Sequence, residues 1–83
     1  MTDERIVRVY VNGRGVDVRL SGTALDAVRA SDPAAADAVL AGARAIADSR
    51  GIVTPPETPL HGGAIFRVVS ARAARDADAD RLD

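Results

Sequence analysis

The 83-residue chain contains no cysteine, no lysine and no tryptophan, and the first two absences each exclude a class of chemistry. Without cysteine, the chain has no disulfide, no thiolate metal site and no cysteine nucleophile. Without lysine, no side chain can form a Schiff base with a substrate. The single histidine, His61, lies in a segment rich in proline and glycine, with Glu57 as its nearby acid. The composition therefore predicts no catalytic residue, no metal site and no cofactor.

Long hydrophobic runs and an excess of one charge are also missing. No apolar run approaches the roughly 20 residues that a membrane-spanning helix needs. Eleven arginines are interspersed with 12 acidic residues, for a net charge of −1, which argues against a nucleic-acid surface. The chain begins with an acidic stretch and shows no apolar signal region, so we expect a cytoplasmic protein without a transmembrane segment.

Aromatic residues are scarce, since Tyr10 and Phe66 are the only ones. A chain of this length forms one domain and buries about 60% of its unfolded surface. We therefore expect a small core built mainly from valine, leucine, isoleucine and alanine.

The clearest pattern that is present is a β-hairpin between Arg5 and Leu20. Asn12-Gly13 separates two alternating apolar runs, and this dipeptide favours the two-residue turn whose central residues both have positive φ. If these residues form the turn, the register follows by arithmetic, because paired residue numbers sum to 25. The predicted pairs are Val11 with Arg14, Tyr10 with Gly15, Val9 with Val16, Arg8 with Asp17, Val7 with Val18, and Ile6 with Arg19. The valines then share one face, and a slip of one residue would destroy this pattern.

Two helical segments follow the hairpin. Thr23 and Asp26 have the spacing of a capping box, which predicts a helix over residues 24–31. Asp32-Pro33 predicts a second start, because aspartate caps helices well and proline suits the first helical position. A single helix kinked at the proline is the alternative. The expected buried residues are Ala24, Leu25, Val28, Ala36, Val39 and Leu40, with Gly42 ending the second segment.

The second half of the chain predicts a short hairpin and a final strand. Residues 43–47 form a weak strand, residues 48–51 a turn closed by Gly51, and Ile52-Val53 the second arm. The proline-rich residues 55–59 are expected to form a surface loop, after which Leu60 returns to the core. The final strand spans residues 64–71, with Phe66 and Val68 facing the helix. We expect a folded domain over residues 1–71 and a charged, disordered tail over residues 72–83.

This order predicts an α+β fold of the β-grasp type. In that fold a mixed sheet, here of four to five strands, packs on one main helix. Its first and last strands lie side by side and parallel in the centre.

The chain also resembles a known family. The stretches VYVNGRGVDVRL, TALDAV, AIADSRGIVTP and TPLHGGAIFRVV occur in the order and spacing of the small sulfur-carrier proteins of thiamine and molybdopterin biosynthesis. Those proteins are ubiquitin-like β-grasp domains. The resemblance covers residues 6–69 and implies the same fold.

The chain departs from this family at its reactive end. The carriers end in Gly-Gly, whose carboxylate is adenylated and converted to a thiocarboxylate. Glycine is needed there because the tail threads a narrow channel in the activating enzyme. Residues 70–83 of this chain contain no glycine, and Gly62-Gly63 precedes the last strand. The departure predicts that the carrier chemistry is lost.

The sheet face turned away from the helices is the predicted functional surface. Six residues are expected on it: Ile6, Arg8, Tyr10, Arg19, Arg67 and Val69. Tyrosine and arginine are enriched at binding hot spots, and β-grasp relatives bind partners through this face. The alternative is an ordinary solvated surface.

Three functions remain open at this point. The first is a non-enzymatic protein-interaction module or accessory subunit that binds a protein partner. The second is a sulfur carrier matured by removal of all or part of residues 72–83. A structural domain that self-associates through the sheet is a third possibility.

Overall fold

The computed structural model describes residues 5–72 and has five strands and two helices. The elements are β1 Ile6–Val11, β2 Arg14–Arg19, α1 Ala24–Ser31, α2 Pro33–Leu40, β3 Arg44–Asp48, β4 Val53–Thr54 and β5 Ile65–Ser70. The expected tail lies outside the described residues from residue 73 onward. No helix in the described part is both long and apolar enough to cross a membrane.

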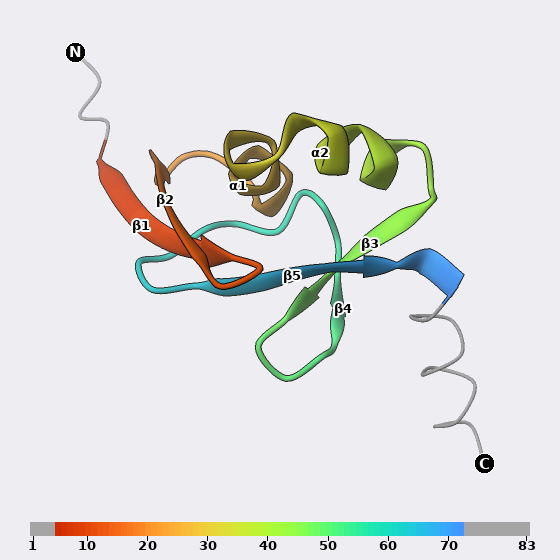
Figure 1. Ribbon diagram of the computed structural model, residues 1–83. Helices are drawn as coiled ribbons and strands as arrows, with labels where there is room; N and C mark the ends of the chain where they lie inside the picture. The colour runs from red at the N-terminus through yellow and green to blue at the C-terminus, as the bar shows by residue number, and fades with distance from the viewer. Residues whose placement is uncertain (1–4, 73–83) are drawn as a thin grey trace.

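The five strands form one mixed sheet in the order β2-β1-β5-β3-β4. β5 lies in the centre, parallel to β1 and antiparallel to β3. Figure 1 shows both helices on the same side of the sheet. The α+β class, the mixed sheet and the central parallel pairing of the first and last strands are confirmed.

The β1–β2 hairpin has the predicted register at all six pairs. Asn12 and Gly13 have φ values of 53° and 79°, as the turn requires. The turn also reaches β5, because the Asn12 side-chain Oδ1 accepts a hydrogen bond from the Val68 backbone N–H at 2.9 Å. The hairpin is therefore anchored to the central strand as well as closed on itself.

The helical region is broken at proline, so the two predicted segments are separate helices and the alternative of one kinked helix is wrong. The single main helix expected for the fold is therefore replaced by two short ones. Asp32 ends α1 by donating its backbone N–H to the Val28 carbonyl at 2.7 Å. The same residue begins α2, because its carboxylate accepts hydrogen bonds from the Ala34 and Ala35 N–H groups. Gly42, with φ of 83°, follows the end of α2 as predicted. The capping box of Thr23 and Asp26 at the start of α1 is also confirmed.

The core lies between the sheet and the two helices. Its largest fully buried side chains are those of Ile46, Val9, Val11 and Val28. Leu60 and Phe66 are buried there as expected. The prediction for Leu40 was wrong, because its side chain is 61% exposed. The last turn of α2 turns Leu40 outward, and Ala35 and Ala36 are the buried residues of that helix.

The proline-rich segment does more than connect β4 to β5. The first backbone N–H groups of a helix lack partners within the helix itself. Here Ala24 and Leu25 donate theirs to the carbonyls of Thr58 and Pro56, each at 2.9 Å. Thr23 also forms an isolated bridge with Pro59. The segment therefore supports the start of α1 and holds it beside the sheet.

Candidate functional site

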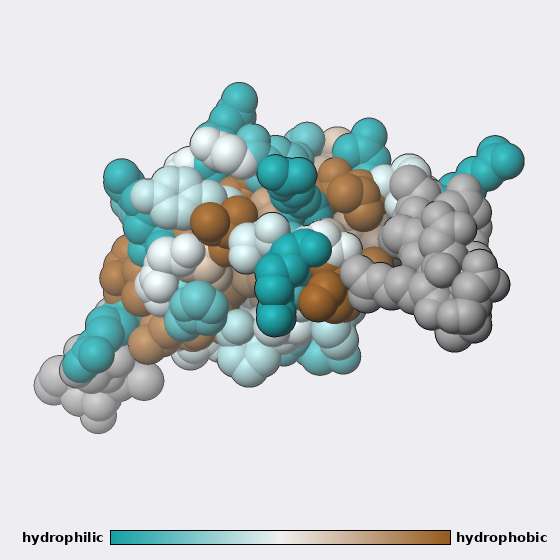
Figure 2. All heavy atoms as spheres, turned by 90° about the horizontal axis from the view of Figure 1, so that it is seen from below, coloured by the Kyte–Doolittle hydropathy of each residue, from teal (hydrophilic) through white to brown (hydrophobic). Residues whose placement is uncertain are grey.

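The sheet face opposite the helices is exposed in the described part of the chain. Figure 2 looks at the molecule from that side and shows hydrophobic patches, in brown, between hydrophilic ones. We call this surface the open face. It carries the even-numbered residues of β1, their partners on β2, and the odd-numbered residues of β5, because successive side chains of a strand alternate between faces.

The hairpin contributes an ion pair and an aromatic ring to the open face. The Arg8 Nε donates a hydrogen bond to Asp17 Oδ1 at 2.9 Å, and both side chains are exposed. This contact lowers the pKa of Asp17 and raises that of Arg8, mainly through the hydrogen bond. Tyr10 is 39% exposed and pairs with Gly15. A Cβ at Gly15 would lie 3.4 Å from both the Tyr10 ring and the Arg8 side chain, at the near limit of ordinary van der Waals contact, so both side chains lie over this glycine.

β5 continues the surface next to Tyr10. Ile65 is the parallel partner of Tyr10 and is 46% exposed. Arg67 follows on the same face and is exposed, and Val69 is half-buried. The sheet thus brings Tyr10, Arg67 and Val69 onto one surface as the sequence predicted.

Two apolar residues of this surface were missed by the sequence argument. The sequence argument placed Ile65 in the last strand but did not predict which face of the sheet it lies on. Its spacing of two residues from Arg67 indicates that both side chains lie on the same face. Val53 is 41% exposed and pairs with Ala47, which in turn pairs with Arg67. The position of Val53 depends on the pairing of β3 with β4 and with β5. The sequence contains no motif that predicts these pairings. Ala47 is buried although it lies outside the main core cluster.

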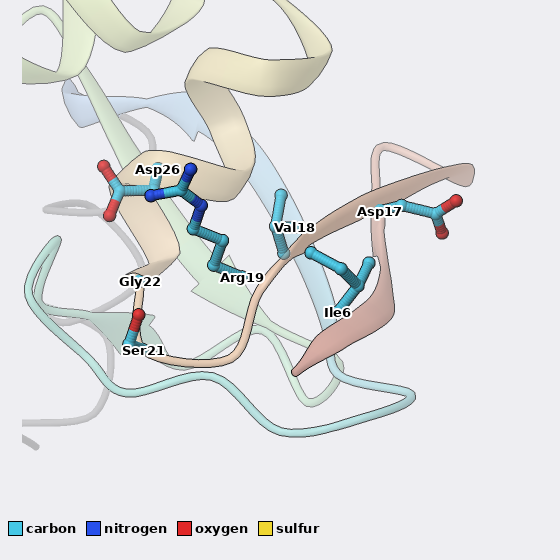
Figure 3. A pocket seen from close by; sticks show the side chains of 7 residues that line it. All are labelled: Ile6, Asp17, Val18, Arg19, Ser21, Gly22 and Asp26. Carbon is cyan, nitrogen blue, oxygen red and sulfur yellow. The ribbon is translucent and has the colours of Figure 1, made fainter. Parts of the chain in front are cut away.

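Ile6 and Arg19 lie at one end of the open face, where the surface is hollowed. They are paired across β1 and β2. Figure 3 shows them beside a depression of about 550 Å³ between β2, the loop that follows it and the first turn of α1. Its lining residues are Ile6, Asp17, Val18, Arg19, Ser21, Gly22 and Asp26. These two predicted residues therefore face a different environment from Tyr10 and Ile65.

The open face carries both apolar and charged side chains. Among the described residues there is no group of three or more histidine, cysteine or acidic side chains that could hold a metal ion. His61 lines a second depression together with Asp48, Thr54 and Ile65. What the open face offers is apolar area from Tyr10 and Ile65 beside an exposed guanidinium, Arg67.

Comparisons of the chain with models of known protein families, with curated proteins and with solved structures find no match.

Proposed function

We propose that the chain is a β-grasp domain that binds a protein partner through the open face and carries out no chemistry of its own. The observation that carries the proposal is the juxtaposition of Tyr10 with Ile65 across the β1–β5 pair, both well exposed. Exposed apolar side chains that gather on one surface and are rimmed by polar groups are typical of interaction sites.

The strand order supports the β-grasp assignment. The first and last strands are neighbours and parallel, the sheet is mixed, and the helices cover one face only. This arrangement, together with the sequence motifs, favours a relationship to the sulfur carriers of thiamine and molybdopterin biosynthesis. The cytoplasmic location expected from the sequence remains part of this proposal.

The chemistry of the open face indicates the kind of partner. Its described charged residues are Arg8, Arg19 and Arg67 against the single acid Asp17, which is already bound to Arg8. A surface with excess arginine beside tyrosine and isoleucine suits a partner with apolar side chains flanked by carboxylates, because guanidinium binds carboxylate in a planar, two-pronged geometry. We therefore expect a partner surface of that composition.

The competing function is a sulfur carrier activated by C-terminal trimming. Residues 70–83 contain no glycine, so no trimming point would produce the terminal Gly-Gly of the carriers. Intact mass spectrometry after incubation with an activating enzyme and ATP distinguishes the two functions. An unchanged mass is expected, and an acyl-adenylate or thiocarboxylate on any C-terminus would overturn the proposal.

The binding function is tested by matched substitutions on opposite faces. Tagged full-length chain is isolated from its native host as wild type, Tyr10→Glu and Leu40→Glu. Leu40 is also exposed, at 61% against 39% for Tyr10, but it lies on α2, away from the open face. The Tyr10→Glu chain should lose the partner that wild type and Leu40→Glu retain. If the same proteins co-purify with all three chains in the same amounts, the open face is not the binding site.

A further inference from the structure

The outer edge of β2 is a second surface that can bind another chain, through its backbone N–H and C=O groups. β2 forms one end of the sheet, so no described strand pairs with its outer side. An unpaired edge presents backbone N–H and C=O groups that can pair with another chain. Proteins usually protect such edges with proline, charged side chains (lysine above all), a bulge or a short strand. The six residues of β2 include neither proline nor lysine, and their pairing with β1 is continuous. Arg14, Asp17 and Arg19 are charged, so only a strand whose charges match theirs can pair with this edge.

The hydrogen bonds of β1 determine which β2 groups face outward. Tyr10 donates its N–H to Ala64, and the Arg8 carbonyl accepts from Gly63, so the even residues of β1 bond away from β2. In an antiparallel pair, hydrogen-bonded and non-bonded pairs alternate. The even residues of β2 therefore bond to β1, and Gly15, Asp17 and Arg19 direct their backbone groups to the outer edge.

Outward groups meet outward groups in every antiparallel register whose paired residue numbers sum to an even number. Three of these registers place Asp17 opposite a residue of β2 in the second copy. When residue numbers sum to 34, Asp17 lies opposite Asp17 of the other copy, and like charges oppose pairing. When they sum to 32, Arg14 lies opposite Val18, and Asp17 lies opposite Gly15. When they sum to 36, Asp17 lies opposite Arg19 in both directions. Only this last register forms two pairs of opposite charge.

The same register also matches the apolar residues on the other side of the strand. Val18 lies opposite its own copy at the two-fold axis, and Val16 lies opposite Leu20. Leu20 is exposed and Val16 half-buried in the single chain, so both have apolar surface left to cover. The register that sums to 34 also pairs apolar residues, Val16 with Val18, so the charges select between these two registers and the apolar pairs agree with that choice.

We infer that two copies of this chain associate through antiparallel pairing of their β2 strands, with Asp17 of each copy facing Arg19 of the other. The Arg19 carbonyl already accepts a hydrogen bond from Gly22 at 2.9 Å, but a carbonyl has two lone pairs and can accept a second. A guanidinium has five N–H donors, so Arg19 can bind this carboxylate in addition to another group. Asp17 already accepts hydrogen bonds from Arg8 at 2.9 Å and 3.3 Å, but the two oxygens of a carboxylate have further lone pairs that can accept from Arg19 of the other copy. The depression in Figure 3 lies along this edge and leaves the end of β2 accessible.

The pairing joins the two sheets into one and leaves the open face of each copy available to the partner proposed above. It does not depend on that partner, so either proposal can fail alone. The buried area of two single strands is small, and we therefore expect a weak dimer that forms as the protein concentration rises.

The experiment follows the full-length chain by analytical ultracentrifugation over increasing concentration, with amide hydrogen exchange at the same concentrations. The wild type should dimerise, and the amides of Asp17 and Arg19, which pair across the interface in this register, should become protected as it does. This measurement needs no variant. A chain that stays monomeric, or a dimer that leaves both amides unprotected, overturns the inference.

Charge reversal tests the register. Asp17→Arg places arginine opposite arginine, and Arg19→Asp places aspartate opposite aspartate, so each variant alone should dimerise about tenfold more weakly or worse. An equimolar mixture of the two restores both opposite-charge pairs and should form a heterodimer. Circular dichroism confirms that each variant is folded.

Other outcomes would place the contact elsewhere. If Tyr10→Glu dissolves the dimer while the charge variants do not, the copies associate through the open face and the inference is wrong. It is also wrong if the edge amides become protected only in a complex with another protein.

Discussion

Asn12 has two roles, and they can be measured separately. Its backbone has a φ of 53°, which most side chains disfavour. Its side-chain oxygen accepts the Val68 N–H of β5 at 2.9 Å, beyond the point where β1 ends. The Asn12 N–H itself donates to the Phe66 carbonyl at 3.0 Å. One residue therefore closes the hairpin and extends its contact with the central strand.

Three substitutions at Asn12 separate these roles. Asn12→Gly keeps the positive φ and loses the side-chain acceptor, so we expect it to lower the free energy of unfolding by about 1 kcal/mol. Asn12→Ala loses the side-chain acceptor and also disfavours the positive φ, so it should lower the free energy of unfolding by about 2 kcal/mol. Asn12→Asp keeps an acceptor and should stay close to the wild type. Urea denaturation measures all three, and a wild-type stability for Asn12→Gly would show that the bond to Val68 adds nothing.

At the scale of elements, the β3–β4 hairpin depends on one carboxylate. β4 has only two residues, so the ladder with β3 is short. The Asp48 side chain accepts hydrogen bonds from the Arg50 N–H at 2.9 Å and the Ile52 N–H at 3.0 Å. These bonds favour the charged form, and the bond from Ile52 contributes most to lowering the pKa of Asp48 below its usual 3.8. The charge of this group therefore stabilises the turn.

The lowered pKa predicts the direction of a pH effect. A carboxyl whose pKa falls on folding stabilises the fold above its unfolded pKa and loses that contribution as pH falls through the folded value. Asp48→Asn should therefore be less stable than wild type at neutral pH, and the difference should shrink below about pH 4. Denaturation over a pH series measures it. Arg50→Ala is the control, because it removes only the longer ion pair of 3.5 Å and should keep most of the pH dependence.

A stability difference that is the same at every pH would assign the effect of Asp48→Asn to the geometry of the turn and not to its charge.

At the scale of the whole molecule, stability depends on a small core. Ile46 is the largest of its fully buried side chains. The helices contribute mostly alanine to that core, through Ala24, Ala27, Ala35 and Ala36. Ile46 on β3 is therefore, with Phe66 and Leu60, one of the few large side chains that fill this core. Domains of this size have little stability to lose.

Two substitutions contrast the buried and exposed positions. Ile46→Val removes one methylene from a site that is 1% exposed and should cost about 1 kcal/mol. Leu40→Ala removes more atoms, but from an exposed site, and should change stability by no more than about 0.5 kcal/mol. Thermal or urea denaturation compares the two. A larger loss for Leu40→Ala would place part of the core beneath α2 at its last turn.

The features that the sequence determined by itself are local ones. The hairpin register, the capping box at Thr23, the helix break at Asp32-Pro33 and the turn at Gly51 were all predicted correctly. Each depends on the conformational preference of one residue or on hydrogen bonds within four residues, and such information is carried by neighbours in the chain. The alternation along β1 and β2 adds the face of each residue once the turn is known.

The tertiary structure decided what depends on segments far apart in the chain. Leu40 faces outward because of how α2 packs, although its helical spacing predicted burial. Ile65 lies beside Tyr10 only because β5 pairs parallel with β1, and Val53 joins that face through β3. The carbonyls of Pro56 and Thr58 complete the first turn of α1 from more than 30 residues away. Such contacts are set by how a few strands and helices fit around one small core, and no short stretch of sequence contains that fit.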